Sequence, residues 1–378
     1  MRSSVKAGIL SLVVLALAGC ESPADSNAAG DWHLSDEPVL AIGLTEGEAA
    51  YQFHQVTGVV RLADGRVAVA NGGSQEIRIF DREGRHLRTL GGAGEGPAEF
   101  RSMGSLDHYG EGALLVFDPG GSRVSLFDPD EGFERSWSLE STGRGFFPSA
   151  AYSLDDGSIL VTHLRGNMPG DPSGVIWNAA PVVRYSATGE PMGEVAELPG
   201  DEWFRSDQGQ LIDLPFGRKG QAAVHGNTLY IGDAQTFTVR AYNPEGHSLG
   251  TVERTIEPRP VTPEDIRRSE AARLEQMSEP EAIERTEALH AQIPYPERMP
   301  AYRSLRTDRS GNLWVEGYEP DPNTPSRWTV LAPDGEVLAD RVEMPAGFEP
   351  HWIEEDLVLG VLRDDLDVEY VHGYRLIR

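Results

Sequence analysis

Basic residues are scarce in this chain of 378 residues, which has 33 lysines and arginines against 60 aspartates and glutamates. The formal net charge is −27, and Lys219 is the only lysine besides Lys6. Six basic or histidine side chains nevertheless stand at comparable places, in the loops that lead into predicted strands. If these loops meet, the six form a positive funnel for an anionic small molecule or a protein partner. They are His54, Arg101, Arg218, Lys219, Arg303 and His351.

The arginines have a second interpretation, because they can instead pair with carboxylates in the seams between neighbouring sheets. The negative charge of the whole chain argues against nucleic acid and anionic lipid head groups as partners, since both carry the same sign.

Polar residues at the ends of predicted strands have the atom types of metal ligands. Calcium needs six or more converging oxygens, and zinc sites use closely spaced histidines or cysteines; the sequence shows neither pattern. We therefore expect these side chains to hold neighbouring hairpins by hydrogen bonds, and we expect no metal and no cofactor. The residues are Asn71, Asp118, His163 and Asp233.

Catalytic groups are not evident either. A serine nucleophile in a G-x-S-x-G elbow is absent from the sequence. Paired acids such as Asp155 and Asp156 fall at predicted turns, where aspartate is favoured for local hydrogen bonding. We predict no catalytic residue, and a binding protein is favoured over an enzyme.

The glycine-rich stretch RTLGGAGEGPAEF, residues 88–100, resembles a phosphate-binding loop at first sight. A dinucleotide fingerprint must open a helix, and a P-loop must end in Lys-Ser or Lys-Thr. Here Pro97 to Phe100 leads into another predicted strand, and Glu95 and Glu99 would repel a phosphate. The stretch is therefore predicted to be a sharp corner in the chain, since glycine permits the turns that a corner needs.

A repeat organises most of the chain. Alternating segments end in an aromatic residue or leucine, followed by a short turn and a glycine, and each is preceded by a second alternating segment. This pattern is typical of short antiparallel strands. The repeated segments are IRIFDREG (77–84), VSLFDPDEG (124–132), VVRYSATG (182–189), VRAYNPEG (239–246) and TVLAPDG (329–335).

The spacing of the repeats predicts an all-β, six-bladed β-propeller over residues 32–378, with four antiparallel strands per blade. The intervals suit blades of about 40–50 residues with loop insertions. One long interval, about 263–292, has a helical sequence between blades 4 and 5, with Thr262 and Pro263 at its start. The last blade lacks one strand, and the N-terminal segment 32–43 would supply it and close the ring.

The segments GGAGEGPAEF and FDPGGSRVSLFD resemble the NHL repeat. The chain is similar overall to bacterial six-bladed propeller lipoproteins with NHL-like repeats, most of which have no assigned reaction. The resemblance implies a ligand- or protein-binding module that acts through the channel mouth and inserted loops. Six-bladed relatives also include lactonases and lyases with a metal in the channel, so a metal-dependent enzyme is the alternative. A purely structural subunit of an envelope complex is a third.

Two stretches do not follow the repeat, 163–178 and 199–220. Aromatic residues in them either form a recognition surface or fill the space between blades, and the sequence favours neither. They are Trp177, Trp203, Phe204 and Phe216.

The N-terminal residues predict export. Two basic residues precede a short apolar run, as in a signal peptide over 1–19, and LAGC ends it like the lipobox of bacterial lipoproteins. Cys20 is the only cysteine and is the predicted lipidation site, followed by a flexible tether over 20–31. Loss of residues 1–19 would change the net charge from −27 to −29. Glu21, by resemblance to Gram-negative lipoproteins, favours the outer membrane.

Overall fold

The computed structural model describes residues 30–378 except 144, 167–169 and 276. The predicted signal peptide, Cys20 and most of the predicted tether lie outside this part. Neither helix in the described part is long and apolar enough to cross a lipid bilayer.

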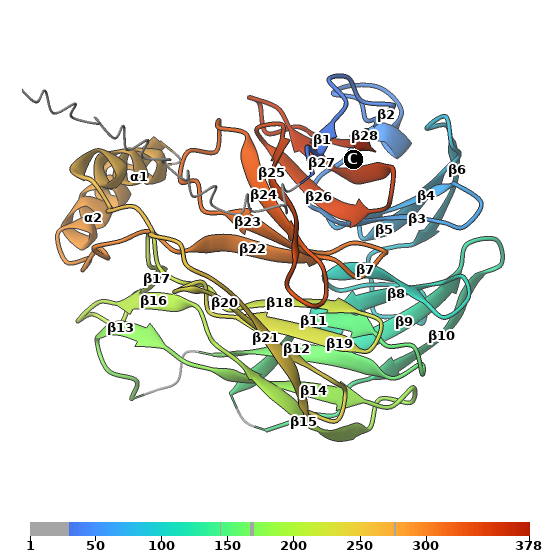
Figure 1. Cartoon of the computed structure of the whole chain (residues 1–378), viewed down its shortest axis with the longest axis horizontal. Helices are drawn as coiled ribbons and strands as arrows, with labels where there is room; N and C mark the ends of the chain where they lie inside the picture. The colour runs from blue at the N-terminus through green and yellow to red at the C-terminus, as the bar shows by residue number, and fades with distance from the viewer. Residues whose placement is uncertain (1–29, 144, 167–169, 276) are drawn as a thin grey trace, which may run out of the picture.

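Four-stranded antiparallel sheets follow one another along the chain, and Figure 1 shows them side by side in chain order. In each, every strand is hydrogen-bonded to the next strand of the same sheet along the chain. The first is β3 (Val56–Arg61), β4 (Val67–Asn71), β5 (Glu76–Phe80) and β6 (His86–Gly91). The second is β7 (Ser105–Tyr109), β8 (Ala113–Asp118), β9 (Arg123–Asp128) and β10 (Gly132–Ser138).

The third to fifth sheets have the same order. The third is β11 (Phe146–Ser153), β12 (Ile159–Arg165), β14 (Ala180–Tyr185) and β15 (Pro191–Leu198). The fourth is β18 (Gln221–His225), β19 (Thr228–Gly232), β20 (Phe237–Tyr242) and β21 (Ser248–Arg254). The fifth is β22 (Tyr302–Thr307), β23 (Leu313–Gly317), β24 (Ser326–Leu331) and β25 (Val337–Met344).

The last sheet joins both ends of the described chain. Its strands β26 (Phe348–Ile353), β27 (Leu357–Arg363) and β28 (Glu369–Ile377) are completed by β1 (His33–Leu34) and β2 (Leu40–Ile42), which both pair antiparallel with β28. The segment 32–43 therefore supplies strands to this sheet as predicted, although residues 35–39 interrupt it.

The middle strands of the sheets are buried on both faces, as in β4, where all five residues are buried. One core cluster unites the first, second and last sheets, with Val69 and Phe80 packed in the same cluster as Val116 and Trp352. The first and last sheets are thus neighbours, as Figure 1 shows for the blue and red strands. Short 3-10 turns at Ala49–Tyr51 and Pro119–Gly121 connect strands.

An accessory unit departs from this pattern. The two stretches outside the repeat form a separate three-stranded sheet of β13 (Gly174–Trp177), β16 (Glu202–Arg205) and β17 (Leu211–Asp213). Helices α1 (Pro263–Glu275) and α2 (Pro280–His290) lie where a helical insertion is predicted. They project from one side of the molecule in Figure 1.

The glycine-rich corner is confirmed as a turn. Gly91 and Gly94 have φ values of 79° and 155°, which only glycine adopts readily. The carboxylate of Glu99 accepts a hydrogen bond from the backbone N–H of Gly96 at 2.8 Å, so it fills the place that an anion would need. Arg123 donates to carbonyl oxygens of the same loop, which holds the corner closed.

Candidate functional site

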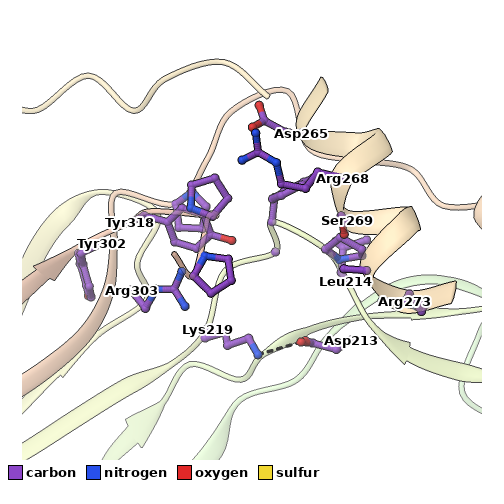
Figure 2. Close-up of a pocket in the computed structure, with 17 residues that line it drawn as sticks. Asp213, Leu214, Lys219, Asp265, Arg268, Ser269, Arg273, Tyr302, Arg303 and Tyr318 are labelled. Atoms are coloured by element: carbon purple, nitrogen blue, oxygen red, sulfur yellow. Dashed lines mark hydrogen bonds and ion pairs between the residues drawn. The ribbon is translucent and has the colours of Figure 1, made fainter. Parts of the chain in front are cut away.

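Two of the six predicted basic residues meet in one cavity. Lys219 and Arg303 line a cavity of about 580 Å³ between the accessory unit and the fifth sheet. Arg268 and Arg273 of α1 line it from the opposite side, and Figure 2 shows Arg268 and Arg303 reaching into it from different elements. Because four cations converge here in a chain of net charge −27, we name this space the cationic cavity.

One face of α1 is turned towards the cationic cavity. The lining residues of this helix recur at intervals of three and four, which is the spacing of a single helical face. They are Asp265, Arg268, Ser269, Ala272 and Arg273. Arg267, next to Arg268, lies outside this face and pairs with Glu264 in solvent.

A small apolar core holds α2 against the accessory sheet. Leu289 of α2 packs with Phe204 of β16 and with Leu214 and Ile293 in a cluster whose members are all buried. Phe216, in the loop after β17, has φ of +60° and packs on Tyr295 with ring centroids 6.4 Å apart. A bulky residue in this left-handed conformation is strained, and such strain is often found at functional sites.

The cations of the cavity are only loosely engaged by the protein. Lys219 Nζ lies 2.9 Å from Asp213 Oδ2, with both side chains nearly half exposed. Arg268 Nη1 lies 3.1 Å from Asp321. Exposed pairs of this kind contribute about 0–1 kcal/mol, so a bound anion can replace them.

The remaining two cations also have capacity for a ligand. The Arg303 guanidinium lies 5.3 Å above the Tyr318 ring, and its Nε is 3.7 Å from Glu316. Arg273 forms no ion pair within the described part of the chain.

The acids that line the cavity do not cancel this charge. They are Asp213 and Asp265. Asp265 is already bound by the Arg259 guanidinium at 2.8 and 2.9 Å and by Thr262, and hydrogen bonding to Arg259 holds its pKa well below the usual range. Its charge therefore belongs to a pair at the start of α1, and the cavity keeps an excess of positive charge.

Arg218 lies next in sequence to Lys219 but is engaged elsewhere. Its Nη2 lies 2.5 Å from Glu202, and its guanidinium stacks 4.2 Å above the Trp177 ring. His54 and Arg101 are also absent from the lining of the cationic cavity. Arg101 pairs with Glu95 at 2.7 Å. The structure therefore does not bring all six predicted residues together.

His351 lies in a different cavity, at the place where the first strands of the larger sheets come together. This channel cavity, of about 320 Å³, is lined by residues from the first strand of every four-stranded sheet and from β26. Burial lowers the pKa of His351, against the opposing effect of Glu349, and burial raises the pKa of Asp107. Arg306 Nη2 donates to Glu349 Oε1 at 3.0 Å across this space.

The polar residues at strand ends hydrogen-bond to the protein. Asn71 accepts from the His54 backbone at 2.8 Å, and Asp118 accepts from the backbone N–H groups of Arg101 and Ser102 at 3.1 and 3.0 Å. Asp233 accepts from Gln235 within its own turn. No group of three or more metal-binding side chains occurs within the described residues.

The aromatic residues of the two stretches divide into a buried pair and an exposed pair. Phe204 and Phe216 are buried in the accessory unit. Trp177 and Trp203 are exposed by 44% and 37% on its sheet. The two arginines of α1 at the cavity were not predicted as site residues, because the sequence of 263–292 indicates a solvated, ion-paired helix.

Solved structures share this fold, although no family model and no curated protein matches the sequence. A member of the DUF4221 family from Bacteroides vulgatus has a TM-score of 0.53 and 12% identity, over 92% of this chain and 99% of the other. A Bacteroides fragilis protein described as exported has a TM-score of 0.50 and 11% identity, over 93% and 98%. A gluconolactonase from Xanthomonas campestris reaches 0.44 at 13% identity, over 93% and 99%.

These likenesses concern the fold alone, because the identities are so low. Together with the succession of antiparallel four-stranded sheets, they show a β-propeller fold.

Proposed function

We propose that this protein is a lipid-anchored envelope β-propeller that binds a small anionic ligand in the cationic cavity. The convergence of Lys219, Arg268, Arg273 and Arg303 on one cavity carries this proposal. Arginine and lysine donors suit carboxylates and phosphates, and the loose exposed pairs can open for a ligand. The two tyrosines of the lining, Tyr302 and Tyr318, add aromatic surface for the body of the ligand.

The proposed architecture has six blades with a closed ring. The first strands of all six larger sheets line one cavity, and the first and last sheets share a core cluster. The pairing of β1 and β2 with β28 supports closure by the N-terminal segment. A ring of this kind leaves only short, protected sheet edges, which is the usual advantage of this arrangement.

The envelope location and the anchor at Cys20 are supported by the lipobox-like LAGC. The similarity in fold to a protein described as exported agrees with them. We infer a bacterial outer-membrane lipoprotein with NHL-like repeats. Cys20→Ser should abolish labelling with radioactive palmitate and release the protein from the membrane fraction; continued labelling would contradict the anchor.

Calorimetric titration of the purified full chain with citrate and with inorganic phosphate tests the anionic ligand. We expect saturable binding that weakens as salt is added, because the attraction is electrostatic. Arg303→Gln and Arg268→Gln should each weaken it about tenfold, which corresponds to about 1.4 kcal/mol.

The matched control is Arg267→Gln, which removes the same charge from the same helix outside the cavity face. Equal losses in Arg267→Gln and Arg268→Gln would show only the effect of net charge and would contradict a site. So would the absence of saturable binding of either anion.

A further inference from the structure

A second cavity lies on the accessory sheet and differs in character from the cationic cavity. Its volume is about 300 Å³, and it lies between the accessory sheet and the third four-stranded sheet. Apolar and aromatic side chains form most of its wall. They are Phe147, Leu164, Ile176, Leu198, Trp203 and Leu211.

Several of these side chains are unusually open to solvent. Phe147 is 60% exposed, Leu164 is 48% exposed and Trp203 is 37% exposed. Single exposed apolar residues are ordinary, but a group of them around one concave space marks a binding site.

The charges that line this cavity leave one carboxylate without an opposite partner. Arg165 and Asp171 form a bidentate pair at 3.1 and 2.9 Å. His163 Nδ1 contacts the carbonyl oxygen of Pro181. Burial lowers the pKa of the His163 imidazole. Asp201 alone among the lining charges forms no ion pair within the described residues.

Within the described part of the chain, Asp201 has a single hydrogen bond. Its Oδ1 accepts from the backbone N–H of Gly220 at 3.1 Å. Burial raises the pKa of this carboxyl group, with the charge of Lys219 opposing the shift. Lys219 itself is paired with Asp213 and faces the cationic cavity. A partly buried carboxylate in this state gains from an added cation.

We propose that this cavity binds a small amine, with the apolar body against its walls and the ammonium group beside Asp201. A carboxylate accepts hydrogen bonds from an ammonium, and the faces of Trp203 and Phe147 also attract a cation. A neutral ligand of the same shape would leave the Asp201 carboxylate without a cation. Its binding would therefore lack this electrostatic attraction. The proposal does not rest on the anion site, because it uses a different cavity and the opposite charge, although Lys219 of the cationic cavity also acts on Asp201.

A pair of probes that share one body tests the proposal on the full chain. Titration with 2-phenylethylamine, followed by tryptophan fluorescence, should give saturable binding at least tenfold tighter than titration with 2-phenylethanol. Asp201→Asn keeps the shape of the side chain and should remove that preference. Trp203→Ala should weaken both probes, because it removes wall area.

Asp207→Asn is the matched control, since Asp207 is an exposed acid of the same unit that does not line the cavity. Equal affinity for the amine and the alcohol in the unchanged protein would overturn the proposal, and so would a preference that survives Asp201→Asn. Circular dichroism checks that Asp201→Asn is folded. Arg303→Gln should weaken citrate binding and leave amine binding unchanged, because Arg303 does not line the cavity proposed for the amine, so the anion site can fail while the amine site remains.

Acidification provides an independent check, because the amine needs the ionised carboxylate. The affinity should fall as the pH drops through the raised pKa of Asp201, while the amine stays protonated throughout. An affinity that stays constant down to the ordinary aspartate pKa would contradict the assignment. The charged and titratable groups around Asp201 and the cavity are Lys219, Asp213, Arg165, Asp171 and His163.

Discussion

At the scale of single residues, the aspartate at the end of β8 holds two segments together. Asp118 is fully buried and accepts from the N–H groups of Arg101 and Ser102, which lead into β7, and from Gly121 in its own turn. Arg123 Nη2 lies 3.5 Å away. The carboxylate oxygens of Asp118 have the atom type of a metal ligand, but they already accept hydrogen bonds from the protein backbone.

Replacing Asp118 tests this structural role. Asp118→Ala leaves three part-buried backbone donors without this acceptor and should lower the free energy of unfolding by about 1–3 kcal/mol. Urea denaturation measures the loss. Asp118→Asn retains an acceptor oxygen and should lose less, so equal losses in the two variants would contradict the hydrogen-bond argument.

Asp118 shows why the hydrogen bonding at strand ends could be predicted from the sequence, whereas the residues that form the cationic cavity could not. Aspartate after an alternating strand and before Pro-Gly-Gly indicates local bonding whatever the rest of the fold does. Lys219 and Arg303 stand out by type and position, but the cavity that they share lies against the accessory unit, and the other four residues of the predicted funnel do not line it. Arg268 differs from Arg267 only in the direction that it faces, and that direction depends on how α1 docks.

At the scale of elements, the position of α1 and the docking of α2 on the accessory sheet decide the shape of the cationic cavity. Both segments come from connections between larger sheets, and neither has a core of its own. Their shared cluster is small, so the unit depends on each of its buried members.

Leu289→Ala tests this dependence. Truncation of a buried leucine costs about 2–5 kcal/mol, and the cost here should fall on the docking of the helices. Hydrogen exchange should speed up in α1, α2, β16 and β17, with the larger sheets unchanged, and citrate binding should weaken. Glu284→Ala, at an exposed position of α2, is the control. Uniformly faster exchange across all sheets would contradict a separate accessory unit.

The strands were predictable because alternation and turn residues are local signals. The accessory sheet was not, because β13 pairs with β16 across an intervening strand pair of the third sheet. A pairing of that kind depends on side chains such as Phe204 that find their partners only in the folded molecule.

At the scale of the whole molecule, the last sheet depends on the N-terminal segment. Removal of residues 30–43 should expose the outer edge of β28 and lower the melting temperature by about 5 °C or more. The truncated protein should also aggregate, which light scattering measures. A peptide of residues 32–43 added in excess should restore the melting temperature. An unchanged, monomeric truncated protein would contradict closure.

The pairing of β1 with β28 also has a consequence in time. The backbone N–H of Arg375 donates to Ser35 Oγ, a contact between residues 340 positions apart. Almost the whole described chain separates β1 from β28, so the other sheets can form from local strand pairs while β1 waits without its partner. The last sheet then assembles only when these two distant segments meet, which makes their pairing a late and slow step in the maturation of the fold.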